Sequence, residues 1–201
     1  MQNAKNRLHN LLKELGYWEN CVDFDSRTIQ RADTNHTETE ATLTLADGRK
    51  IRARGVATKR RDAEIAAAAE IIETIQRNHR DLLIDWPSVR IEAQAGDGLI
   101  KLCGYLSNQT SSAEEKSRWL QRMETDSHMV TLFNRLQADR HPTFTLFGTN
   151  LGNKRKATFI EAMIWRQFGP VILAEGATDA FDRIARFLEH PGKAGRYLEE
   201  V

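Results

Sequence analysis

Three consecutive cations stand directly before a stretch that is typical of a helix. Lys59, Arg60 and Arg61 precede an alanine-rich segment centred on residues 66–69. The first N–H groups of a helix carry partial positive charge, so acidic side chains are the ordinary choice at that position. Cations placed against the helix dipole favour an anionic ligand, and a phosphate fits both the charges and the exposed N–H groups. A solvated basic turn remains the alternative interpretation of these residues alone.

A second basic cluster lies near residue 155. Lys154, Arg155 and Lys156 follow Asn153, and the preceding Gly148 and Gly152 indicate that this basic stretch is a turn before a long apolar helix. Such a turn is a second candidate phosphate contact, with a merely solvated turn as the equal alternative.

The elements that position the first cluster are read from hydrophobic periodicity. Leucines at three- and four-residue spacing predict a helix over Ala4–Leu15, and alternation from Cys21 onward predicts strands. Asp47-Gly48 suits a tight hairpin turn, because such turns need positive φ. The predicted strands lie near Val22–Ile29, at Ala41–Leu45 and at Lys50–Arg54, the last ended by Gly55, and a helix follows over Arg60–Gln76.

The segment from Gly55 through the alanine run resembles the C-terminal part of the double-stranded-RNA-binding domain, with Arg60 and Arg61 in the positions of its paired basic residues. The resemblance covers nearly all of residues 4–76. It implies a domain over residues 1–78 with an α-β-β-β-α fold that binds double-stranded or structured RNA. Such domains recognise A-form shape and 2′-hydroxyl groups rather than sequence.

The same resemblance implies further RNA contacts. It assigns them to the loop Ala32–Thr37, with His36 as the contact, although the Gly-Pro that usually precedes this histidine is absent. Asp33, Glu38 and Glu40 place negative charge near that loop, which weakens phosphate binding. The candidate contacts on the first helix are Asn6, His9, Asn10 and Lys13. Some members of the family bind protein, so an interaction subunit that no longer binds RNA is an alternative.

The second half, residues 85–201, is predicted to be all-α, which makes the whole chain α+β. A polar boundary at Arg77–Asp81 precedes it, and Gly169-Pro170 should kink or break its longest helix. One side of the first of these helices is formed by Ile91, Ala95, Leu99, Leu102 and Cys103. The predicted helices are Ser88–Leu106, Ala113–Met123, Ser127–Leu136, Ala157–Glu175 and Thr178–His190. A lower-ranked alternative places strands at Pro142–Phe147 and Ala157–Trp165, as in a degenerate second RNA-binding domain.

Three segments of this half, Ala95–Leu102, Asp126–Phe133 and Ala174–Phe181, resemble the ribonuclease III catalytic domain in order and spacing. That family's enzyme places the catalytic domain first, whereas here it would come second. Two-metal hydrolysis needs clustered carboxylates to hold Mg²⁺ and orient water. Asp97 is the only matching acidic position, because Ala93 replaces the glutamate four residues earlier and Glu161 has Ile164 three residues on. We therefore expect no catalytic residue, no metal site and no cofactor.

These expectations favour an RNA-binding adaptor in RNA processing or ribonucleoprotein assembly. Its inactive ribonuclease III-like half would serve as a scaffold or dimerise, through the apolar helix Thr158–Leu173. The partner would be a second copy or another protein. The enzymatic alternative is a divergent, Mg²⁺-dependent, double-strand-specific ribonuclease that uses Asp97 with Glu92 or Glu161.

The composition limits the class of protein to which the chain can belong. Hydrophobic residues make up 40% and charged residues 28%, which is typical of a globular chain. Because 29 basic residues stand against 28 acidic ones, RNA binding must depend on local clusters rather than on net charge. Cys21 and Cys103 form neither a CxxC pair nor a disulfide framework, and no apolar run is long enough for a membrane span. We expect the cytoplasm or another reducing intracellular compartment.

Overall fold

The computed structural model describes residues 3–31, 34–106, 111–175 and 178–199. The chain is mixed α+β and divides into two compact units. We call Met1–Ile84 together with Thr145–Leu151 the sheet unit, and Asp85–Phe144 together with Gly152–Val201 the helical unit. The sequence predicted a boundary near residue 80, but nothing in it indicated that residues 145–151 would belong with the first half.

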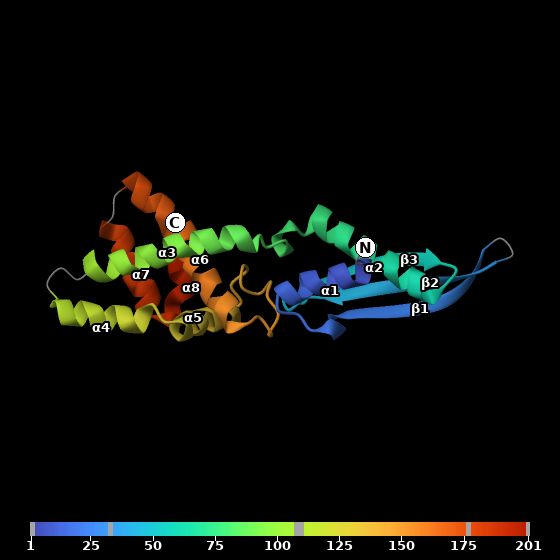
Figure 1. The fold of residues 1–201 in the computed structure, drawn as a ribbon, viewed down its shortest axis with the longest axis horizontal. Helices are drawn as coiled ribbons and strands as arrows, with labels where there is room; N and C mark the ends of the chain where they lie inside the picture. Colours follow the sequence, from blue (N-terminus) through green and yellow to red (C-terminus); the bar gives the residue numbers. More distant parts are fainter. Residues whose placement is uncertain (1–2, 32–33, 107–110, 176–177, 200–201) are drawn as a thin grey trace. The chain divides into compact units, whose positions relative to one another are not determined.

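The sheet unit has the predicted order of helix, three strands and helix (Figure 1). The strands pair antiparallel in the order β1-β2-β3. Short 3₁₀ turns at Glu19–Cys21 and Arg80–Leu82 flank these elements. The bounds are α1 (Ala4–Glu14), β1 (Val22–Arg31), β2 (Thr34–Thr44), β3 (Lys50–Ala57) and α2 (Arg60–Asn78).

Both helices cover one face of the sheet (Figure 1), and small residues let α2 lie close to β3. Ala63 and Ala67 are fully buried against the strands. Gly55 does not end β3, as the sequence suggested, but lies within it. A Cβ atom at Gly55 would come within 2.2 Å of the Ala63 carbonyl oxygen, so the glycine is required by the approach of the helix rather than by a strand end.

The β1–β2 hairpin extends beyond the third strand. The predicted loop Ala32–Thr37 is wrong for residues 34–37, which belong to β2, while residues 32 and 33 lie outside the described ranges. Ala57, the last residue of β3, pairs with Thr37, so residues 29–31 and 34–36 form a two-stranded arm. The threonines of this stretch favour extended backbone, although no hydrophobic alternation marks it.

Residues 142–147 form turns and residues 157–165 are helical, which rules out the predicted alternative of strands there, and the helical unit contains no strand in its described part. No helix that the structure describes is both long and apolar enough to span a membrane. The chain closes with the 3₁₀ turn Pro191–Lys193 before its last helix. The helices are α3 (Trp86–Leu106), α4 (Ala113–Met123), α5 (Asp126–Ala138), α6 (Asn153–Glu175), α7 (Thr178–Glu189) and α8 (Ala194–Glu199).

The prediction of a separate basic turn before α6 is wrong, because the helix starts at Asn153 and the basic cluster forms its first turn. Of the predicted kink or break at Gly169-Pro170, the break is wrong, since the helix continues through Pro170. An interior proline costs about 3 kcal/mol. Burial of an apolar face offsets this cost, because Phe159, Ile164 and Phe168 are all at most 1% exposed.

The buried face of α3 also differs from the predicted one. Leu99 and Cys103 are buried as expected, but Ile91 is 70% exposed and Leu102 is 49% exposed. The inward face uses Trp86, Val89, Ala93, Leu99, Ile100 and Cys103. Because α3 carries apolar residues on more than one side, periodicity alone did not show which side faces the core.

Candidate nucleic-acid interface

The first turn of α2 presents its cations to solvent. Lys59, Arg60 and Arg61 are all exposed, and Lys59 is the extended residue just before the helix. No described side chain caps the helix start, so its first N–H groups remain available to an anion. Among the described residues, neither Lys59 nor Arg61 forms an ion pair. The arrangement can therefore bind a phosphate through both side chains and backbone.

Glu64 connects this turn to α1. It accepts a hydrogen bond from Lys5 Nζ at 2.8 Å and another from Arg60 Nε at 3.0 Å. The hydrogen bond from Lys5, followed by that from Arg60, lowers the pKa of Glu64 below its usual value against the opposing effect of partial burial. One acid thus fixes the start of α1 beside the start of α2 and offsets part of the positive charge of the cluster.

The candidate contacts on α1 lie along its solvent side. Asn6, Asn10 and Lys13 are exposed at successive turns, whereas His9 is half-buried at the margin of this face. The side-chain oxygen of Asn3 caps the helix by accepting from the Asn6 N–H at 3.0 Å. The structure thus places all four candidates on one helix without bringing them into a single cluster.

His36 lies in a strand rather than in the predicted loop. It pairs with Ile29 on the arm, and its Nε2 lies 3.0 Å from Thr34 Oγ1. The arm and the start of α2 share one end of the sheet, because Thr37 pairs with Ala57 and α2 begins three residues later at Arg60. His36 therefore belongs to the same end of the sheet unit as the basic turn.

The second basic cluster is only partly available to a ligand. Lys156 is 8% exposed and donates a hydrogen bond to Asn134 at 2.8 Å, and its burial lowers its pKa. Arg155 stacks over the Trp86 ring at 5.0 Å. Lys154 is exposed and lies 3.7 Å from Asp126. Of the predicted three-residue phosphate contact, Lys156 is therefore the member least accessible to a ligand.

The acids of α3 and α6 meet where these helices pack most closely. A Cβ at Gly96 would lie 1.9 Å from the Glu161 carbonyl oxygen. Asp97 pairs with Lys101 at 2.7 Å, and Glu92 pairs with Arg166 at 2.6 Å. Asp97 and Glu92 thus each have a basic partner on the surface of the helical unit.

Glu161 has an unusual environment that the sequence did not indicate. Burial, followed by the charges of Asp97 and Asp126, raises its pKa from 4.5 to about 7. Nothing in the sequence pattern linked Asp126, at the start of α5, to this place. Within the described ranges, no group of three His, Cys, Asp or Glu side chains has the arrangement of a metal site.

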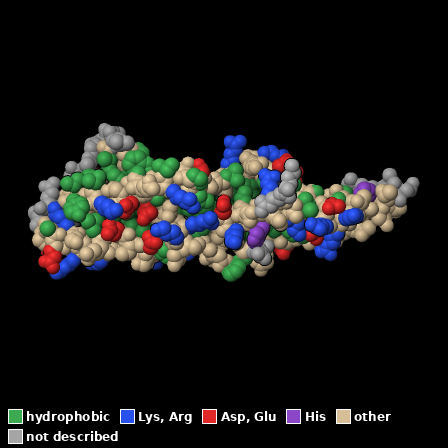
Figure 2. Space-filling view, in the orientation of Figure 1, with side chains coloured by type: hydrophobic (Ala, Val, Ile, Leu, Met, Phe, Trp, Pro, Cys, Tyr) green, Lys and Arg blue, Asp and Glu red, His purple; other side chains and the backbone are tan. Residues whose placement is uncertain are grey.

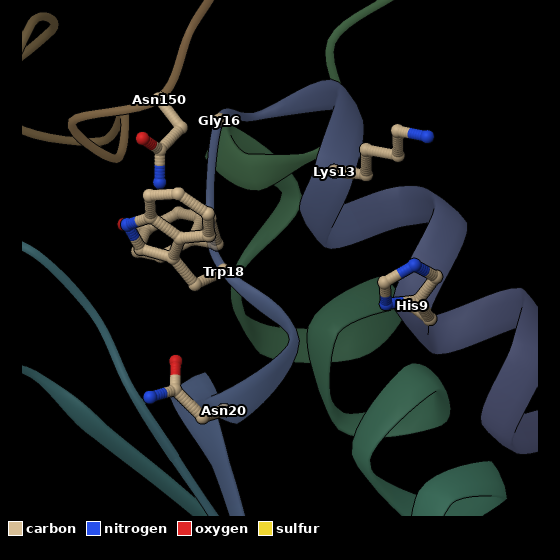
Figure 3. Close-up of a pocket in the computed structure, with 7 residues that line it drawn as sticks. His9, Lys13, Gly16, Trp18, Asn20 and Asn150 are labelled. Atoms are coloured by element: carbon tan, nitrogen blue, oxygen red, sulfur yellow. The ribbon is translucent and has the colours of Figure 1, made fainter.

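The sequence also missed a cavity of about 720 Å³ in the sheet unit (Figure 3). It lies beside the end of α1 and borders the segment 145–151. Only the sequence Tyr17-Trp18, a pair of aromatic residues among polar ones, hinted at it. Its walls include His9, Lys13, Tyr17, Trp18, Asn20 and Asn150.

Comparison of the chain with known protein families, with curated proteins and with solved structures finds no match.

Proposed function

We propose that the protein is an RNA-binding adaptor in which the sheet unit holds double-stranded or structured RNA and the helical unit joins two chains. One observation carries this proposal: an uncapped helix start with three exposed cations follows a three-stranded antiparallel sheet in an α-β-β-β-α unit. This is the arrangement that the resemblance to double-stranded-RNA-binding domains implies. Figure 2 shows lysine and arginine side chains on the visible face of this unit.

The spacing of the candidate groups suits a duplex better than a small anion. His36 and the basic turn lie at one end of the sheet unit. Lys13 lies toward the other end, since the following Tyr17 binds the β2–β3 turn at Ala46. A duplex that is recognised by its shape presents phosphates and 2′-hydroxyl groups at well-separated places. Side chains along one side of the sheet unit can contact several of these groups at once.

On the opposite face of the sheet, two exposed arginines are paired with acids. Arg27 hydrogen-bonds Glu38 across the β1–β2 pair, and Arg54 pairs with Glu40 at 3.1 Å across the β2–β3 pair. These exposed pairs form a charge-balanced ladder. Lys50 and Arg52 are also exposed on this face, so the helix side is favoured as the RNA surface by its uncapped helix start rather than by charge alone.

The acids of the helical unit support a non-catalytic role for it. The ribonuclease III family places an Asp and a Glu three residues apart in this long helix. If Glu161 is the second of the two, the first position holds Thr158, which cannot replace a carboxylate. Asp97 and Glu92 each pair with a cation. A divergent Mg²⁺-dependent ribonuclease remains the second candidate because the charges of Asp97 and Asp126 both act on Glu161.

The partner in this proposal is a second copy, and α3 replaces α6 as its binding surface. The apolar side chains of the predicted interface helix pack largely in the core, since Phe159, Ile160 and Phe168 are buried. Apolar side chains reach the surface of the helical unit (Figure 2). The exposed large apolar residues of α3 are Ile91, Leu102, Tyr105 and Leu106.

The α3 stripe, defined as Ile91, Ala95, Gly98, Leu102 and Tyr105, is suited to pairing with itself. Its members recur every three or four residues, so they share one side of the helix. A Cβ at Gly98 would meet nothing within 4 Å, so this middle position is open to a close neighbour. If two copies cross antiparallel at Gly98, Ile91 of each lies opposite Tyr105 of the other. Such a self-complementary surface is what a twofold dimer requires.

A competition assay tests the RNA-binding proposal. A labelled RNA duplex of about 20 base pairs is bound first, and unlabelled RNA or DNA duplex of the same sequence is then added. We expect the RNA competitor to displace the label at a far lower concentration than the DNA competitor, because the 2′-hydroxyl groups and A-form shape are recognised. Equal competition by both would contradict the proposal.

A further inference from the structure

Trp18 is the exposed tryptophan of the sheet unit. It is 65% exposed, whereas Trp86 and Trp119 in the helical unit are each 6% exposed. Leaving so large an aromatic ring in water forfeits the burial that usually stabilises such side chains. The ring borders the cavity described above and a second hollow, which is also lined by His9 and Asn6 of α1. Trp18 thus lines two hollows beside the candidate RNA helix.

The floor of the cavity is fixed by contacts from a distant part of the chain. Gly148 N donates to Leu15 O at 2.9 Å, and Asn150 N donates to Gly16 O at 3.0 Å. The two glycines make this approach feasible, because a Cβ at Gly148 would lie 2.3 Å from the Gly16 carbonyl oxygen. Gly16 itself has a φ of +80°, which a residue with a side chain rarely adopts.

Tyr17 stabilises the same floor. Its hydroxyl donates to Leu146 O at 2.8 Å and accepts from the Ala46 N–H at 3.1 Å. It therefore ties the end of α1, the β2–β3 turn and the segment 145–151 together. The cavity is consequently preformed, which lowers the entropic cost of binding a ligand there.

The groups around the Trp18 ring match the chemistry of a nucleobase. Figure 3 shows the Asn150 side chain pointing toward the Trp18 ring, with Asn20 beyond the ring and His9 and Lys13 on α1. An aromatic ring stacks on any base, and a side-chain amide offers both a donor and an acceptor to a base edge. A cation beside them suits the adjoining phosphate. A volume of about 720 Å³ accommodates a purine with its sugar.

We infer that this cavity binds an unpaired purine of RNA stacked on Trp18, so that the protein prefers duplexes with a single-stranded end over blunt ones. The inference rests on the proposed function, because the duplex on the α1 side would bring its unpaired end to the cavity. Lys13 belongs to both the exposed side of α1 and the cavity wall, so one RNA can engage both.

Three RNAs test the inference with full-length protein: a blunt duplex of about 20 base pairs, the same duplex with two unpaired adenosines at each 3′ end, and a single-stranded tetra-adenylate. We expect the overhang to tighten binding roughly tenfold. Trp18→Ala should abolish this preference while blunt-duplex binding stays unchanged, and Trp18→Phe should retain part of it. The indole N–H resonance that is missing in Trp18→Phe identifies the Trp18 signal for nuclear magnetic resonance.

The outcomes separate the cavity from the duplex surface. Equal binding of blunt and overhang duplexes, with a stationary Trp18 resonance, would overturn the inference and leave the proposed function intact. If neither duplex binds but tetra-adenylate shifts the Trp18 resonance in the wild type and not in Asn150→Ala, the cavity assignment stands and the duplex proposal fails. If no RNA binds and no resonance moves, both are wrong.

Discussion

Arg60 and Glu64 are joined across the first turn of α2 by a hydrogen bond of 3.0 Å between Arg60 Nε and Glu64 Oε1. Glu64 also holds Lys5 of α1, so the acid both stabilises the helix pair and competes with an RNA phosphate for Arg60. This dual position makes Glu64 a direct probe of the basic turn.

Removing the charge of Glu64 should therefore separate stability from RNA affinity. We expect Glu64→Gln to tighten duplex binding by about two- to fivefold, because the carboxylate no longer neutralises the positive charges of Arg60 and Lys5. The free energy of unfolding should fall by about 0.5 to 1 kcal/mol. Urea denaturation and duplex titration measure the two effects. Glu73→Gln is the matched control, since Glu73 pairs with Arg77 at 2.8 Å near the other end of α2. Equal RNA affinity in Glu64→Gln and wild type would contradict this account.

The pH dependence of stability follows from the same carboxylate. Because the folded state lowers the pKa of Glu64 from 4.5, its contribution is fully present above that value and is lost as the pH falls through the lower folded-state pKa. We expect the wild type to lose more stability than Glu64→Gln between pH 5 and pH 3. An equal loss of unfolding free energy in both proteins, measured by urea denaturation, would show that this ion pair contributes nothing to the pH dependence of stability.

Neutralising the basic turn should weaken RNA binding and its salt dependence together. We expect the double change of Arg60→Ala and Arg61→Ala to weaken binding about tenfold or more. The dependence on salt should also flatten, since each phosphate-binding cation contributes about one unit to the slope. Arg77→Ala is the control, because Arg77 is an equally exposed arginine at the far end of the same helix. A similar loss of RNA affinity in Arg77→Ala would mean that affinity depends on the overall charge of the protein and not on the basic turn.

Glu161 should destabilise the helical unit as the pH rises. Its folded-state pKa of about 7 lies above the usual 4.5, so the folded state binds more protons than the unfolded chain between these values. Stability therefore declines from pH 4.5 toward pH 7. We expect Glu161→Gln to be more stable than wild type at pH 8 by on the order of 1 kcal/mol, and nearly equal at pH 4.5. A more stable wild type at pH 8 would indicate that the carboxylate has a favourable partner.

The α3 stripe should control self-association. We expect Leu102→Asp to raise the dimer dissociation constant at least tenfold, because it places a charge in an apolar contact. Sedimentation equilibrium measures this constant without assuming a molecular shape. Gln121→Asp on α4 serves as the control, since it changes charge at an exposed site of the same unit. A wild-type chain that stays monomeric at high micromolar concentration would rule out the stripe as a homodimer surface.

The sequence predicted well those features that local patterns determine. Leu8 and Leu12 are buried where the periodicity of α1 placed them. Gly48 has the positive φ that the Asp-Gly turn requires, and the Arg49 N–H bonds to Asp47 Oδ1 at 2.9 Å. The basic turn of α2 was found because charge at a helix start is a local signal.

The features that were missed depend on contacts between distant residues. Thr34–His36 carry no hydrophobic alternation, so only their pairing with β1 shows that they form a strand. The sequence predicts a strand end at Gly55, because a glycine in sequence does not reveal the helix that packs on it. The cavity beside Trp18 could not be predicted, since Asn150 reaches it through the approach of two glycines more than a hundred residues apart.

The central claim is tested most directly by titrating an RNA duplex of about 20 base pairs with the full-length protein at low and moderate salt in the presence of Mg²⁺. The bound RNA is then run on a denaturing gel, with Asp97→Ala in parallel. The account predicts binding that weakens with salt over RNA that stays intact in both proteins. Cleavage by the wild type that disappears in Asp97→Ala would contradict the non-catalytic role, and absence of binding at low salt would contradict the RNA-binding role itself.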